Sequence, residues 1–73
     1  MPEIKVASDM DARVWKIEVA VGDMVAEGGT LLILESMKTE LPIDAPRAGR
    51  VAQILVVETD TVTDGQVLVV LEG

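Results

Sequence analysis

The chain has 73 residues, with 13 acidic and 6 basic side chains for a net charge of −7, and contains neither cysteine nor histidine. Zinc sites built from cysteine and histidine and catalytic triads that use histidine are therefore excluded, and the acidic charge argues against a nucleic-acid partner. A chain of this length is expected to form one small domain, a monomer on its own. Because the sequence has no apolar signal-peptide core and no membrane-length apolar run, we expect a soluble protein in the cytoplasm with no membrane partner.

The first half of the chain has the composition and periodicity of short β-strands. Over the whole chain, Val and Ile supply 17 residues against a single aromatic residue, Trp15. In residues 14–21, Trp15 and Ile17 alternate with the charged Lys16 and Glu18, so this stretch is expected to form a half-buried strand with Trp15 in the core or at its edge. The strands predicted in this half are residues 4–6, 14–21, 24–25 and 31–34.

The second half repeats this order of strands and turns. Pro46 and Gly49 suit a type I turn before its longest strand. No segment favours a helix, so we predict an all-β fold in which two four-stranded antiparallel sheets face each other as a flattened barrel-sandwich. The strands predicted in this half are residues 41–43, 51–57, 62 and 67–71.

The two halves are an internal repeat. Residues 3–35 align without a gap on residues 40–72, with 11 identities in 33 positions. Such halves are expected to fold about a quasi-twofold axis as a single domain, residues 1–73. Residues 36–39 are left between the copies, and their equivalent place in the second copy is the chain termini. The sequence therefore predicts a tight, solvent-facing hairpin at the end of the domain opposite the termini.

Lys38 lies on this predicted hairpin. The other two lysines, Lys5 and Lys16, align with residues of the other copy, whereas Lys38 has no counterpart. A methionine beside it, Met37, would suit recognition by another protein if it is exposed, because Met is an adaptable contact residue. Spacing alone leaves open the alternative that Met37 packs into the core and Lys38 simply occupies a turn.

The hairpin sequence ESMKTE, with GDMVAEGGTLLILE before it and ELPIDAPRAGRV after it, resembles the biotinyl/lipoyl attachment domain. The resemblance is strongest to the short, single-domain biotin carboxyl carrier proteins and covers essentially the whole chain. It implies a flattened barrel of two four-stranded sheets in which the lysine of a Met-Lys-Met hairpin receives biotin. By this resemblance the cofactor is attached to Lys38 and Met37 is the methionine that precedes it. The candidates for recognition by a ligase or partner are Glu35, Met37, Thr39 and Glu40. The alternative for Glu35 and Glu40 is that they are simply the charged, soluble ends of the strands that flank the tip.

Two features of the sequence depart from the biotin carrier pattern. Thr39 stands where biotin carriers usually have Met, which bears on how efficiently a ligase modifies Lys38, and Asp11 and Ala12 replace a common Pro-Gly turn. Glu35 also fits the Glu-Thr-Asp-Lys-Ala pattern of lipoyl domains, although Met37 replaces its Asp. A lipoyl carrier is therefore one alternative, and an unmodified scaffold or binding domain of the same fold is another.

The resemblance implies a carrier rather than an enzyme. A biotin protein ligase would attach biotin, a biotin carboxylase would load it with a carboxyl group, and a carboxyltransferase would pass that group to an acceptor. No catalytic residue and no metal ligand is expected in the chain, because nothing in the sequence assembles a nucleophile, a base and an orienting group.

Overall fold

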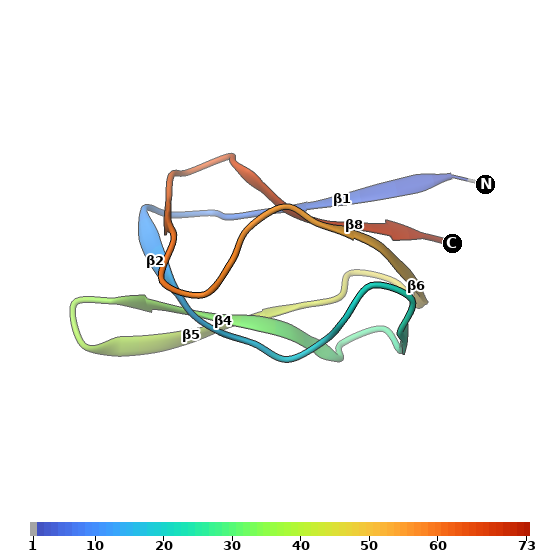
Figure 1. Ribbon diagram of the computed structural model, residues 1–73, viewed down its shortest axis with the longest axis horizontal. Coiled ribbons are helices and arrows are strands. Elements are labelled where there is room, and N and C mark those ends of the chain that lie inside the picture. The colour runs from blue at the N-terminus through green and yellow to red at the C-terminus, as the bar shows by residue number, and fades with distance from the viewer. Residues whose placement is uncertain (1) are drawn as a thin grey trace.

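The computed structural model describes residues 2–73, which form eight short β-strands and no helix (Figure 1). One sheet has the strand order β1-β8-β6-β3 and the other β5-β4-β2-β7, and every strand pair is antiparallel. The predicted all-β barrel-sandwich is confirmed. Within the described residues no helix is long and apolar enough to cross a membrane. The strands are β1 (Glu3–Ala7), β2 (Ala12–Ile17), β3 (Met24–Val25), β4 (Thr30–Ser36), β5 (Thr39–Asp44), β6 (Gly49–Ile54), β7 (Thr61–Val62) and β8 (Val67–Glu72).

The two sheets are related by the same 37-residue shift that relates the two halves of the sequence. Strands β2 and β3 coincide with β6 and β7 under this shift, and the two strand orders map onto each other. Hydrogen bonds between the halves repeat as well: the Gly22 amide donates to the Val51 carbonyl, and the Thr59 amide donates to the Val14 carbonyl, both at 2.8 Å. This correspondence confirms the predicted quasi-twofold repeat.

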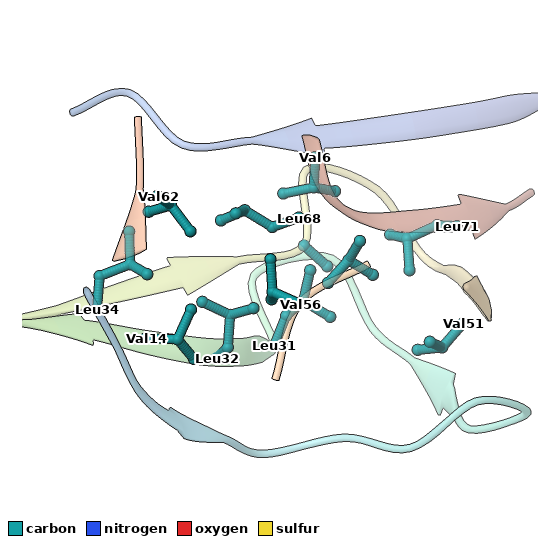
Figure 2. Close-up of a cluster of buried hydrophobic side chains, with 12 residues drawn as sticks. Val6, Val14, Leu31, Leu32, Leu34, Val51, Val56, Val62, Leu68 and Leu71 are labelled. Atoms are coloured by element: carbon teal, nitrogen blue, oxygen red, sulfur yellow. The ribbon is translucent and has the colours of Figure 1, made fainter. Parts of the chain in front are cut away.

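The core between the sheets is entirely aliphatic. Strand β4 of one sheet and strand β8 of the other contribute six of its twelve buried residues, and Leu31, Leu34, Leu68 and Leu71 are fully buried there (Figure 2). Full burial of one such side chain stabilises the folded state by about 1.5–3 kcal/mol. Because both sheets share this one core, neither half buries its apolar face without the other.

Trp15 lies outside this core, so the prediction for it is wrong. The register of β2 against β4 pairs Val14 with Leu34 and Lys16 with Ile33, which leaves Trp15 as an extra residue between two rungs. A bulge of this kind interrupts the inward–outward alternation. Val14 is consequently fully buried, whereas Trp15 is 44% exposed. The predicted strand 14–21 also ends earlier than expected, at Ile17.

Gly49 belongs to strand β6 rather than to a turn, so its predicted role is wrong as well. A Cβ atom added to Gly49 would lie 2.5 Å from the Glu72 carbonyl oxygen on the neighbouring strand β8. Glycine is needed there because the two backbones approach too closely for any side chain.

The hairpin between β4 and β5 and the two chain ends lie at opposite ends of the molecule, as predicted (Figure 1). The molecule measures 36 × 18 × 17 Å, so this hairpin projects along its longest axis.

Candidate functional site

The tip of the β4–β5 hairpin, residues 36–39, is a two-residue turn. Strand β4 ends at Ser36, which pairs with Thr39 at the start of β5, so only Met37 and Lys38 lie between the strands. Both have positive φ angles, 51° and 66°, which is the signature of the type I′ turn that joins tightly paired strands. This conformation costs a non-glycine residue about 1–2 kcal/mol. The flanking strands, rather than the residues of the turn, must therefore stabilise it.

The side chains of the tip face solvent. Met37 is 95% exposed, so the alternative that it packs into the core is wrong. Lys38 and Thr39 are exposed and Ser36 is half-buried. Lys38 takes no part in the three ion pairs that the structure shows among residues 2–73, which leaves its amino group open to another protein.

Glutamates form the second rung beneath the turn. Glu35 on β4 lies directly opposite Glu40 on β5, and like charges in this position destabilise strand pairing. On its other side Glu35 pairs with Arg13 of β2, whose Nη2 lies 3.1 Å from Glu35 Oε1. The residues predicted to be recognised by a ligase thus include a carboxylate that already has a partner within the chain.

Sequence reasoning missed Arg13. Its signal is nevertheless present in the internal repeat, since Arg13 aligns with Arg50 and Glu35 aligns with Glu72. The structure shows the corresponding ion pair between Arg50 and Glu72. An Arg–Glu pair that occurs twice at equivalent positions belongs to the architecture of both sheets.

Two surface hollows lie away from the tip. One, of about 500 Å³, is lined by Met24, Arg50 and Glu72 at the end of the molecule that carries the termini. The other, of about 370 Å³, lies between the edges of β1 and β5 and includes Lys5, Pro42 and Asp44. Neither hollow includes Lys38, which lies on the exposed turn.

Comparison with known proteins decides the family. Residues 1–71 match the biotin/lipoyl family, whose model is described as "Biotin-requiring enzyme". The chain is a biotin/lipoyl domain. The family predicted from the sequence is therefore confirmed.

Relatives of this biotin/lipoyl domain occur both as short proteins and inside large ones. A biotin/lipoyl attachment protein of Bacillus subtilis is 42% identical over 68 residues, which cover 93% of each chain. The biotinylated protein TB7.3 homolog of Mycobacterium leprae is 35% identical over 90% of this chain and 93% of its own. The crystal structure of Kluyveromyces lactis urea carboxylase contains the same fold, with a TM-score of 0.92 at 35% identity, but this domain covers only 6% of that chain.

The structure brings all five predicted site residues onto one hairpin of this biotin/lipoyl domain. Lys38 and Met37 form the turn, Thr39 closes it, and Glu35 and Glu40 form the next rung. Their roles in attachment and recognition stay predictions. The tip suits an amide-linked cofactor, because it presents a primary amine on a tight turn and no carboxylate among residues 2–73 forms an ion pair with that amine.

Proposed function

We propose that this protein is a biotin carboxyl carrier in which Lys38 is the residue that receives biotin. One observation carries the proposal: the lysine that has no counterpart in the internal repeat stands in a two-residue turn at the end of the molecule farthest from the termini. Because Lys38 is exposed in this location, a ligase and then other enzymes can reach it. Membership of a biotin-requiring family supports biotin as the group attached.

In this proposal the domain positions Lys38 for other enzymes and catalyses no step itself. Attachment forms an amide between Lys38 Nζ and the carboxyl group of biotin, and the lysine ammonium must lose a proton before its nitrogen can attack. The biotin protein ligase supplies biotin as an acyl-adenylate and accepts that proton, and AMP leaves as the bond between the acyl carbon and the phosphate oxygen breaks. When bound, biotin supplies a ureido nitrogen that carries a carboxyl group between two enzymes.

The proposed partners are a biotin carboxylase and a carboxyltransferase. The occurrence of this fold within the chain of a urea carboxylase supports a carboxylase assembly. A tethered cofactor visits each partner at a high effective concentration, so weak docking of the carrier is sufficient. The cytoplasm stays the compartment predicted from the sequence.

A lipoyl carrier is the second candidate. Glu35, three residues before Lys38, favours it, whereas Met37 occupies the position where lipoyl domains have Asp. Both cofactors would be joined to the same amine, so geometry at the tip does not separate them.

The experiment that decides is the intact mass of the protein purified from its own source, with peptide mapping around Lys38. A biotin increment on Lys38 is the expected result. A mass increase that matches a lipoyl group on Lys38 would show that the protein is a lipoyl carrier instead. An unmodified Lys38 in cells that contain a competent biotin ligase would refute the carrier function and leave a scaffold or binding domain of the same fold.

A further inference from the structure

The turn that carries Lys38 depends on the rungs beneath it. Met37 and Lys38 both adopt a left-handed conformation that such residues disfavour. The first rung, Ser36 opposite Thr39, closes the turn, and the second rung, Glu35 opposite Glu40, must hold the two strand ends together. Any force that separates the second rung is therefore transmitted to the turn.

Charge opposes closure of the second rung. Two carboxylates directly opposite each other repel, and their repulsion acts on adjacent strand ends with no further strand beyond β5. Arg13 lies on the other side of Glu35 and forms the 3.1 Å ion pair with it. The row Arg13, Glu35 and Glu40 thus places one positive charge beside two negative charges across three strands.

We propose that Arg13 is a positioning residue for the reaction at Lys38. It acts through Glu35. By compensating the negative charge of the Glu35–Glu40 rung, Arg13 keeps the two strands of the hairpin paired and holds Lys38 in a single orientation. The inference rests on the proposed function, because it concerns the modification of Lys38. It assigns to Glu35 a role within the chain in addition to any contact with a ligase.

The internal repeat supplies a matched control at the opposite end of the molecule. Arg50 forms an ion pair with Glu72, and Glu72 lies opposite Glu3, so the same row of one arginine and two glutamates recurs. Strands β8 and β1 are not consecutive in the chain, however, and this second row therefore supports no turn. Loss of Arg50 should cost a similar amount of global stability without affecting the tip.

The test compares R13Q, R50Q and R13K in the full chain with two measurements. The first is the solvent exchange of backbone amides in residues 35–40 of the unmodified protein, followed by NMR. The second is kcat/KM for modification by a biotin protein ligase supplied with biotin and ATP. We expect R13Q to increase amide exchange and to lower kcat/KM, each by about two- to fivefold, which corresponds to one exposed charge contact. R50Q should change neither value, and R13K should restore most of both.

Two further conditions examine the repulsion itself by amide exchange alone. Adding E40Q to R13Q removes one of the two like charges and should return the exchange rates to those of wild type. Raising the salt concentration to about 1 M should do the same for R13Q, since the screening length then falls to about 3 Å.

The outcomes separate the inference from the proposed function. Wild-type protein that accepts no biotin refutes the proposed function itself. If the wild-type protein accepts biotin, two results would refute the inference and leave the proposed function standing. One is that R13Q and R50Q behave alike, and the other is that R13Q increases amide exchange at the tip without lowering kcat/KM. A loosened tip that neither E40Q nor salt restores would refute charge repulsion as the cause.

Discussion

Gly22 and Thr59 occupy equivalent positions in the two halves, and both have a positive φ, 98° and 80° respectively. Each donates its amide to a valine carbonyl of the opposite half at 2.8 Å. The fold therefore requires a left-handed residue twice, and the sequence provides glycine only once. Thr59 bears the strain that Gly22 avoids, because a β-branched side chain is unfavourable in this conformation.

The first prediction concerns this pair. Thr59→Gly should raise the free energy of unfolding by about 0.5–1 kcal/mol, because relief of about 1–2 kcal/mol of strain exceeds the added chain entropy of glycine. Gly22→Ala should lower it by about 1 kcal/mol, although no atom beyond the adjoining residues of the chain lies within 4 Å of the added Cβ. Urea unfolding measures both variants. Equal destabilisation by both changes would contradict the argument from backbone conformation.

A second prediction follows from the contact between Gly49 and Glu72. Gly49→Ala should destabilise the protein by about 1–3 kcal/mol, since its Cβ would lie 2.5 Å from the Glu72 carbonyl oxygen and strands β6 and β8 would have to separate. Ala12 is the equivalent residue of the other half and provides the control. Ala12→Gly should cost only about 0.5–1 kcal/mol, from backbone entropy. A Gly49→Ala variant as stable as wild type would show that the two strands can move apart freely.

The third prediction contrasts Trp15 with Leu34. Trp15→Ala should cost about 1 kcal/mol or less, because the ring stands on a bulge and is 44% exposed. Leu34→Ala should cost about 2–5 kcal/mol, as expected when a fully buried side chain is removed from a packed core. Thermal unfolding followed by circular dichroism compares them. A larger loss for Trp15 than for Leu34 would place the indole in the core after all.

These residues show how far the sequence predicts the structure. The internal repeat and the alternation of apolar residues were sufficient to predict the two sheets, the quasi-twofold relation between the halves and the location of Lys38 on an exposed hairpin. The bulge at Trp15 could not be predicted, because neither flanking residue is a glycine or another marker of a bulge. The close contact of Gly49 and the row that contains Arg13 depend on which residues face each other across strands. Strand register is fixed only when the sheets form around a common core.

The fourth prediction concerns Thr39, which stands where biotin carriers usually have Met. Thr39→Met should raise the rate of biotinylation of Lys38, since it restores the Met-Lys-Met sequence on an exposed strand end where the larger side chain meets no obstacle within the fold. Ligase kinetics with wild type and variant measure the effect. Because Thr39 pairs with Ser36 next to the turn, amide exchange in residues 35–40 serves as the control for an altered hairpin. An unchanged or lower rate with an intact hairpin would mean that Thr39 is neutral or adapted to its own ligase.

The last prediction separates the role of Lys38 in function from its role in the fold. Lys38→Arg should abolish modification, because a guanidinium cannot replace the primary amine as the acyl acceptor. The same change should leave the unfolding midpoint nearly unchanged, since Lys38 is exposed and forms none of the ion pairs found among residues 2–73. Intact mass after incubation with ligase, biotin and ATP measures the extent of modification, and a thermal melt measures the unfolding midpoint. Lys16→Arg, which changes another exposed lysine, is the matched control and should leave both unchanged. A marked fall in the midpoint of Lys38→Arg would show that the turn depends on the lysine itself, and continued modification would move the attachment site to Lys5 or Lys16.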